Sequence, residues 1–382
     1  MANVSSSNGL EKRPKLRFPG FDKPWKVFKA EELFQNITDK NHPDETVLTI
    51  IQGKGTLPRE QAGRNIHYDD ASLSNYKKVE QGDFIIHLRS FEGGLEMANE
   101  AGIVSPAYTI LRCKRPHSSL FYDAYFHTDE FINHNLSKSV EGIRDGRQIS
   151  YEAFKWLGIP YCEPTEQEKI SNLFAALNER IAKQRDLIEA LKKYKRGAVT
   201  HILSGKSTAF AVTSSWTEQT LSELCSEFRS GRNISATLIH QNGNYPVYGG
   251  NGIRGYCNQY SHDGEYVVVG RQGALCGNVR LIQGKNYLSE HAIAVQANEA
   301  NETKFLLYLL DYMKLGQYSD QGAQPGLAVN KLLRLKCMVP DKQTQIKIAS
   351  FLMSFDFQIS TQERMLMLLN NQRRALLQQL FI

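Results

Sequence analysis

The chain of 382 residues is long enough for two or three domains with hydrophobic cores, and its 41% hydrophobic and 23% charged residues are ordinary for a globular protein. No apolar run approaches the roughly 18 residues that a membrane-spanning helix needs, and the polar N-terminus carries no secretory signal. The six cysteines are scattered without a CxxC pair, so we expect no metal site, no disulfide framework and a cytoplasmic location. The net charge of +6 weakly favours a polyanionic partner and not a membrane.

In chain order, the sequence describes two similar halves, each a turn-rich block followed by one long helix. Both blocks open with the same signature at the same spacing, which is Trp25, Glu32 and Leu33 in the first half and Trp216, Glu223 and Leu224 in the second. Runs of β-branched and aromatic residues bounded by Gly, Asn and Ser predict short strands. They lie at 45–52, 82–88, 108–112, 264–270, 278–282 and 292–296. An internal repeat of this kind predicts a duplicated architecture.

The two predicted helices overlay at one constant offset, which places Gln167 on Gln345 and Arg196 on Arg374, and both repeat their seam positions in alternating steps of four and three. The pairing residues predicted in the first helix are Ile170, Phe174, Leu177, Ile181, Gln184, Ile188 and Leu191, followed by Lys195, Ala198 and Ile202. Those of the second helix are Ile348, Leu352, Phe355, Ile359, Gln362, Leu366 and Leu369, followed by Arg373, Leu376 and Leu380. Even the polar interruptions coincide, which favours a coiled coil between the helices over two amphipathic helices that pack separately on their own domains.

The length of the helices predicts their orientation. A helix of about 39 residues is roughly 58 Å long, whereas the polar link 204–215 reaches at most about 40 Å. The second block should therefore sit where the first helix ends, so that its own helix runs back. We predict an α+β fold in which two similar mixed domains are separated by two long helices that form an antiparallel coiled coil with pseudo-twofold symmetry.

The sequence shows no catalytic constellation. The segment 250–255 matches GxGxxG by letter, but the residues that follow are poor helix formers, so a nucleotide-binding turn is disfavoured. Gly205-Lys206-Ser207 lacks the leading glycine of a phosphate loop, because residue 200 is Thr. HExxH, GxSxG and the Asn/Asp-Pro-Pro-aromatic tetrapeptide of aminomethyltransferases are all missing. We therefore expect a non-catalytic chain that needs no cofactor of its own.

Polar and aromatic residues on glycine-rich segments are the candidates for binding DNA. In the first block they are Arg59, Arg64, Asn65, Tyr68, Lys77, Lys78, Arg89 and Ser90. In the second block they are Tyr248, Asn251, Arg254, Tyr256, Arg271 and Gln272. Arg can fork onto guanine and Asn or Gln onto adenine in the major groove, while Lys, Ser and Tyr commonly contact phosphates. Each residue taken singly is better explained as a solvated charge or a turn residue, so the prediction depends on the cluster.

Several segments together resemble the specificity (S) subunit of type I restriction-modification systems. They are 14–21 with Trp25, 75–79 leading to 82–84, 102–108, 245–252, 270–274 and 166–170. The resemblance implies two target-recognition domains, at 20–163 and 206–340, that each read half of a split DNA site. It also implies conserved spacer helices, at 164–205 and 341–382, that set the gap and dock two methyltransferase subunits; residues 1–19 are left as an N-terminal tail.

The resemblance further implies double-stranded DNA as the target, N6-adenine methylation with S-adenosylmethionine in the partner subunits, and ATP-driven cleavage once restriction subunits join. The loops that read bases vary within the family, so no base-reading residue is carried over. One departure concerns the Pro before the helix, because Pro160 and Pro164 flank 161–163 in the first half and leave that helix start uncertain by a turn. The alternatives are a related methyltransferase-only or bifunctional system, a fused nuclease or methyltransferase, and a free-standing DNA-binding repressor.

Overall fold

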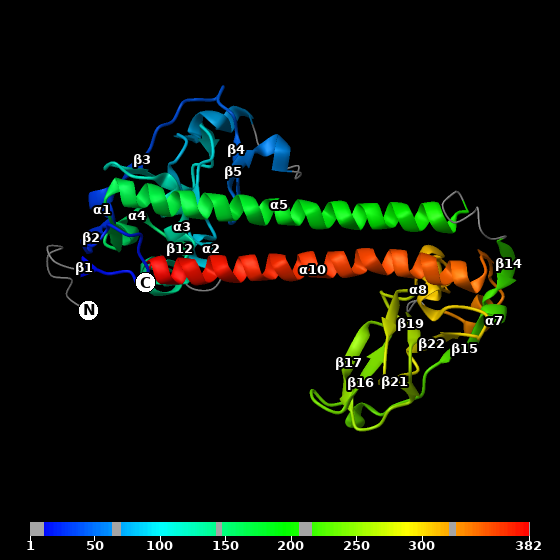
Figure 1. Cartoon of the computed structure of the whole chain (residues 1–382). Helices are drawn as coiled ribbons and strands as arrows, with labels where there is room; N and C mark the ends of the chain where they lie inside the picture. Colours follow the sequence, from blue (N-terminus) through cyan, green and yellow to red (C-terminus); the bar gives the residue numbers. More distant parts are fainter. Residues whose placement is uncertain (1–10, 63–69, 143–146, 206–215, 321–325, 382) are drawn as a thin grey trace. The chain divides into compact units, whose positions relative to one another are not determined.

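The computed structural model describes residues 11–62, 70–142, 147–205, 216–320 and 326–381 (Figure 1). The chain divides into two compact units. Unit 1 comprises Met1–Gln184 and Met365–Ile382, and unit 2 comprises Arg185–Arg364. The two long helices, α5 (Pro164–Leu203) and α10 (Lys342–Phe381), each have 40 residues and contribute to both units.

Unit 1 consists of short strands and helices. Its strands are β1 (Glu11–Lys12), β2 (Trp25–Lys29), β3 (Phe34–Ile37), β4 (Leu48–Ile51), β5 (Gly55–Pro58), β6 (Lys77–Val79), β7 (Phe84–Ile86), β8 (Glu96–Met97), β9 (Gly102–Val104), β10 (Thr109–Cys113), β11 (Val140–Glu141), β12 (Gln148–Ile149) and β13 (Gly158–Tyr161). Its shorter helices are α1 (Ala30–Leu33), η1 (Arg59–Ala62), η2 (Asp70–Asn75), α2 (Ser90–Gly93), α3 (Ser119–Phe126), η3 (Glu130–Asn135), η4 (Leu136–Ser139) and α4 (Tyr151–Phe154).

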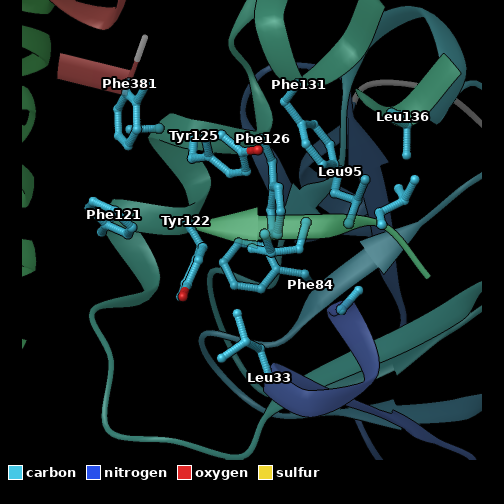
Figure 2. Close-up of a cluster of buried hydrophobic side chains, with 14 of the residues drawn as sticks. Leu33, Phe84, Leu95, Phe121, Tyr122, Tyr125, Phe126, Phe131, Leu136 and Phe381 are labelled. Carbon is cyan, nitrogen blue, oxygen red and sulfur yellow. The ribbon is translucent and has the colours of Figure 1, made fainter. Parts of the chain in front are cut away.

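A four-stranded antiparallel sheet in the order β3-β10-β7-β8 is the scaffold of unit 1. Alternate side chains of its strands point to opposite faces. One face, with Phe34 and Phe84, packs against the aromatic residues of α3 (Figure 2). The other face, with Ile85 and Ile110, packs against residues of β4, β6 and β9. The sheet is therefore buried on both faces.

Unit 2 has the same kinds of elements. Its strands are β14 (Thr217–Thr220), β15 (Cys225–Ser230), β16 (Tyr245–Gly249), β17 (Gly252–Cys257), β18 (His262–Asp263), β19 (Tyr266–Gly270), β20 (Val279–Ile282), β21 (Lys285–Leu288), β22 (Ala292–Ala297) and β23 (Lys336–Val339). Its shorter helices are α7 (Leu221–Leu224), η6 (Ala236–Leu238), α8 (Thr303–Tyr312), η7 (Leu315–Tyr318) and α9 (Val329–Leu332).

The scaffold of unit 2 is an antiparallel sheet in the order β15-β22-β19-β20, with α8 on one face (Figure 1). The opposite face packs against Tyr248 and Leu288 from a second sheet, whose order is β17-β16-β21-β18. The segment 250–255 belongs to a hairpin of β16 and β17 and is not followed by a helix, so it is no nucleotide-binding turn.

The repeat predicted from the sequence is visible element by element. The order β2, α1, β3 in unit 1 returns as β14, α7, β15 in unit 2, and the two scaffold sheets correspond strand by strand. A carboxylate caps the short helix in both units: Glu32 accepts a 2.8 Å hydrogen bond from the Lys29 amide, and Glu223 a 2.6 Å bond from the Thr220 amide. A last strand, β13 or β23, then pairs antiparallel with β2 or β14 and leads into the long helix.

The same buried glutamine ties each long helix to its unit. Gln167 accepts a hydrogen bond from the Ser118 amide before α3 and donates to the Cys162 carbonyl. Gln345, its equivalent in the repeat, accepts from the Glu302 amide before α8 and donates to the Pro340 carbonyl. Both side chains are at most 1% exposed, so each amide satisfies backbone groups that burial would otherwise leave unpaired.

The long helices pair antiparallel within each unit. In unit 1, Ile170 and Phe174 of α5 share a core with Leu377, Leu380 and Phe381 of α10. In unit 2, Val199, Ile202 and Leu203 of α5 share a core with Ile348 and Leu352 of α10. Every seam position named above is buried or half-buried. The predicted fold class is confirmed: two mixed α+β domains joined by two long helices.

The basic interruptions of the seam have partners on the facing helix. In unit 2, Lys195 forms a 2.5 Å ion pair with Asp356, which also accepts a hydrogen bond from Tyr308. In unit 1, the repeat-equivalent Arg373 donates a 2.8 Å hydrogen bond to Asn178. These polar contacts fit one register only, as polar residues in a coiled-coil seam are known to do.

The helix starts are also clear. In the first half α5 begins at Pro164, where a missing amide proton costs little. In the second half α10 follows Asp341, whose carboxylate accepts a 2.9 Å hydrogen bond from the Thr344 amide. None of the helices among the described residues is long and apolar enough to cross a membrane.

Candidate nucleic-acid interface

The hairpin of β16 and β17 in unit 2 carries exposed polar residues at and near its turn. Its two-residue turn, Gly250-Asn251, has the composition that tight hairpins favour. Asn251 is exposed at the tip, and Arg254 is exposed on β17. The stem of Arg254 lies so close to Gly249 that a Cβ there would be 2.5 Å from Cδ. A glycine thus lets this side chain lie flat on the hairpin.

A second arginine reaches the same turn from the scaffold sheet. Arg280 of β20 places its guanidinium over Gly252, where an added Cβ would lie 2.9 Å from Nη1. Gly252 has a φ of +100°, a conformation that favours glycine. In the described part of unit 2, neither Arg254 nor Arg280 has an ion-pair or hydrogen-bond partner for its guanidinium. Arg280 was not predicted from the sequence, although a lone charge in the apolar strand Val279–Ile282 was a usable signal.

The two other predicted residues near this hairpin have partners within the protein. Arg271 is half-buried, and its guanidinium donates 3.4 Å hydrogen bonds to the carbonyls of Leu327 and Glu290. Gln272 accepts a 2.6 Å hydrogen bond from His291 Nδ1. Both side chains hold loops together, which favours a supporting role over base contact.

The two tyrosines predicted in this block are half-buried. Tyr248 packs against the core under the scaffold sheet. The backbone of Tyr256 exchanges two hydrogen bonds with His240, at 2.8 and 2.9 Å. The exposed polar side chains at this turn are therefore Asn251 and Arg254 of the hairpin and Arg280 of β20.

The predicted residues of unit 1 are less well grouped. Arg64, Asn65 and Tyr68 lie outside the described residues. Arg59 is half-buried at the start of η1. Ser90 is fully buried, and its hydroxyl accepts a 2.9 Å hydrogen bond from the His87 amide, which does not favour a phosphate contact.

The other basic residues predicted in unit 1 form hydrogen bonds or ion pairs within the protein and differ in their exposure. Lys77 donates a 2.6 Å hydrogen bond to the Tyr108 carbonyl, and burial, helped by the nearby Lys40, lowers its pKa. Lys78 pairs with Glu45 at 2.5 Å, and this hydrogen bond raises the pKa of Lys78. Arg89 is 68% exposed and pairs with Glu92 on the same turn. Exposed pairs of this kind exchange readily for contacts with a polyanion, because they are worth little in water.

A buried carboxylate and histidine fix the β4–β5 hairpin, directly before Arg59. Glu96 accepts hydrogen bonds from the amides of Gly53 (2.6 Å) and Gly55 (2.9 Å) and contacts His127 Nε2 at 3.3 Å. His127 Nδ1 donates to the Asp123 carbonyl at 2.7 Å. Burial is the largest single effect and opposes both charges. It is outweighed by the hydrogen bond between the two side chains together with Asp123 beside His127 and the Gly53 and Gly55 amides beside Glu96, so that the pKa of His127 is raised and that of Glu96 is lowered.

This pair predicts a pH dependence of stability. The His127 contribution is complete below its ordinary pKa of 6.5 and is lost as the pH rises through the raised value. The Glu96 contribution is complete above its ordinary pKa of 4.5 and is lost as the pH falls through the lowered value. We expect His127→Gln to lower the free energy of unfolding most between pH 4.5 and pH 6.5, the two ordinary pKa values, and progressively less in alkaline solution. Chemical unfolding at a series of pH values, with the exposed His134→Gln as control, measures it; a cost that grows with pH contradicts the assignment.

The long helices expose apolar side chains away from their seams. In unit 2 these are Leu187 (45% exposed), Tyr194 (66%), Phe351 (41%) and Phe357 (74%). In unit 1 they are Met365 (40%), Met367 (56%) and Leu368 (53%). Leu187 and Met365 hold equivalent positions in the repeat of the two helices. Exposed apolar groups that gather on one element are typical of protein-protein contacts.

Known proteins resemble the chain in sequence. The family model of the type I restriction modification DNA specificity domain matches residues 213–369. The type I restriction enzyme EcoprrI specificity subunit of Escherichia coli is 46% identical over 142 residues, which are 36% of this chain and 35% of that protein. A putative type I specificity subunit of Mycoplasma pneumoniae is 28% identical over 141 residues, 35% of this chain and 46% of that protein. These matches thus span less than half the length of either relative.

Solved structures resemble the chain over nearly its whole length. The type I restriction-modification S subunit from M. genitalium superposes with a TM-score of 0.64 at 18% identity, covering 97% of this chain and 99% of that one. The HsdS subunit from Thermoanaerobacter tengcongensis gives 0.50 at 17% identity, with 97% and 98% covered. At these identities the likeness shows the fold. The chain therefore has the fold of the type I restriction-modification specificity (S) subunits and contains, at 213–369, the DNA specificity domain of that family, as its sequence indicated.

Proposed function

We propose that the chain is the non-catalytic subunit that gives a type I restriction-modification enzyme its DNA sequence specificity. Its two mixed domains, at 20–163 and 206–340, act as target-recognition domains. The observation that carries the proposal is the exposed hairpin of unit 2, with Asn251 and Arg254, on a scaffold that the chain repeats in unit 1. An antiparallel two-stranded ribbon of this kind fits the major groove of DNA.

A duplicated scaffold with different loops implies a bipartite and asymmetric site. The scaffold sheets of the two units share their strand order, but different strands cover them. Unit 2 has the hairpin β16–β17, whereas unit 1 has the pairs β4–β5 and β6–β9. Because the loops carry recognition on a shared scaffold, each unit reads its own half-site. The two half-sites are expected to be unlike and separated by base pairs that are not read.

The same subunit docks two methyltransferase subunits on its long helices, and restriction subunits join that complex. The exposed apolar side chains of α5 and α10 support this part of the proposal, since Leu187 and Met365 offer equivalent contacts in the two halves of the repeat. Two equivalent contacts suit two copies of one partner. The reaction itself, transfer of a methyl group to adenine, then belongs to the partner subunits.

The first test concerns Arg254. In the complex with its methyltransferase, Arg254→Ala is expected to lower the free energy of binding to the cognate sequence by about 1–3 kcal/mol. It should also relax the base preference at one position of the second half-site. Arg334→Ala, which removes an exposed guanidinium outside the hairpin, serves as the matched control. Methylation of a library of sites measures both variants. Equal loss of methylation on every sequence would reduce Arg254 to a contact with the DNA backbone.

The second test concerns docking. Leu187→Ser and Met365→Ser are each expected to weaken binding of the methyltransferase. Together they should lower the binding free energy by more than about 2 kcal/mol, as truncation of buried interface residues does. Leu238→Ser is the control, because Leu238 is 49% exposed but lies in η6 outside the long helices. Isothermal titration with purified subunits gives the affinities. Unchanged affinity in the double variant would place the docking surface elsewhere.

A further test separates this function from catalysis and from autonomous repression. The chain alone, incubated with DNA and S-adenosylmethionine, is expected to transfer no methyl group, and it is expected to select its site only in the presence of the methyltransferase. Transfer by the lone chain would make it an enzyme. Tight, selective binding without a partner would make it a repressor.

A further inference from the structure

The edge strand of the unit 2 scaffold brings a second guanidinium to the hairpin turn. Arg280 lies on β20, opposite Val268 of β19. Its neighbours Val279 and Leu281 pack on the core that contains α8, whereas Val268 and Ile282 belong to the opposite face. Because side chains alternate along a strand, Arg280 leaves the sheet on the face away from α8.

The hairpin is shaped to receive this side chain. The guanidinium of Arg280 lies over Gly252, and a Cβ at that position would stand 2.9 Å from Nη1 and 3.3 Å from Nη2. The stem of Arg254 lies over Gly249, the residue that pairs with Gly252 across the turn. The two arginines therefore lie over the two paired glycines of one turn, and neither glycine has a side chain that would displace them.

We propose that Arg280 is a specificity-determining residue that contacts a base of the second half-site beside the base read by Arg254. This assignment rests on the proposed function and adds a residue to its recognition surface. Two arginines and the Asn251 amide then converge on one tip, which supplies the forked donors that guanine accepts and the amide that suits adenine.

The surroundings of Arg280 favour contact with a base. The side chain is exposed, and none of the described acidic residues pairs with its guanidinium. A hollow of about 160 Å³ beside the turn is lined by Gly252, Arg280, Asn278 and Asp311. An arginine that lies over a glycine and is not paired with a carboxylate keeps its fork of donors available for a planar partner.

The test uses the full complex with the methyltransferase and a library in which every position of the wild-type site is varied. Arg280→Ala is expected to relax one position of the second half-site by about tenfold or more. That position should differ from the one that Arg254→Ala relaxes, and the first half-site should stay unchanged. Arg280→Lys should fail to restore the preference, because a lysine lacks the bidentate fork.

Three results would overturn the assignment. An unchanged profile in Arg280→Ala means that the side chain contacts no base. An equal loss on all sequences with a shallower salt dependence means that it contacts a phosphate. If the two alanine substitutions relax different positions of a defined wild-type site, both proposals stand. If Arg254→Ala relaxes a position and Arg280→Ala relaxes none, the proposed function stands and only the assignment of Arg280 fails. A wild-type complex that methylates no defined sequence overturns the proposed function, and the assignment with it. Equal unfolding midpoints for wild type and Arg280→Ala establish that the variant is folded.

Discussion

Replacement of Phe381 by alanine is expected to lower the free energy of unfolding by about 3–5 kcal/mol, the usual cost of removing a large aromatic residue from a core. Phe381 is fully buried near the end of α10, within unit 1. The centroid of its ring lies 5.2 Å from that of Phe121 and 5.6 Å from that of Tyr125 (Figure 2). The ring centroids of Trp25 and Phe174 lie 6.0 Å and 6.3 Å away. A residue close to the C-terminal end thus completes a core built from residues far earlier in the sequence.

Chemical denaturation of the purified chain measures this effect. Phe357→Ala is the control, because Phe357 lies on the same helix but is 74% exposed; it should change the stability by less than about 0.5 kcal/mol. Similar small effects of both substitutions would show that the end of α10 does not form part of the unit 1 core.

A fragment of residues 1–205 is expected to dimerise. Without α10, the fragment leaves Ile170 and Phe174 of α5 uncovered. Its own α5 ends with Val199, Ile202 and Leu203, which match Leu377, Leu380 and Phe381 in the repeat and are buried in unit 2 just as those are in unit 1. A second copy can therefore supply the missing partner through an isologous antiparallel contact. The dimer should direct methylation to an inverted repeat of the first half-site.

One substitution sharpens this prediction. In the fragment dimer Leu203 takes the place of Phe381 among the aromatic rings, so a gap remains where the larger ring was. We expect Leu203→Phe to tighten the dimer, by about 1 kcal/mol or more, because filling such a gap recovers apolar contact. Sedimentation gives the dimer affinities and methylation mapping gives the site. A monomeric fragment, or a dimer that directs methylation to the original asymmetric site, would contradict the equivalence of the two halves.

The helices could be predicted from the sequence because their seam obeys a period. Five heptads with matching interruptions at Lys195 and Arg373 constrain the register strongly, and both residues indeed contact the facing helix. The six predicted strand segments all overlap strands of the structure, since β-branched runs bounded by turn residues are a local signal. The buried role of Gln167 and Gln345 was not predicted, although their identical positions in the repeat marked them.

The candidate interface could be predicted only in outline. A sequence shows that Arg271 and Gln272 are polar, but not that carbonyls of Leu327 and Glu290 and the ring of His291 already occupy their polar groups. Ser90 looked like a surface residue and is buried as a turn-stabilising acceptor. Arg280 is a lone charge in the apolar strand Val279–Ile282, but its proximity to Gly252 depends on how two sheets pack, which the local sequence does not show.

The most direct test of the proposed function is to map methylated adenines in a host that lacks other adenine methylation and expresses this chain with its methyltransferase. We expect methylation at one asymmetric site made of two unlike half-sites, separated by base pairs that are not read and centred roughly one helical turn apart. Deletion of the chain should abolish the pattern. A continuous or palindromic target, or methylation that persists without the chain, would contradict the proposed function.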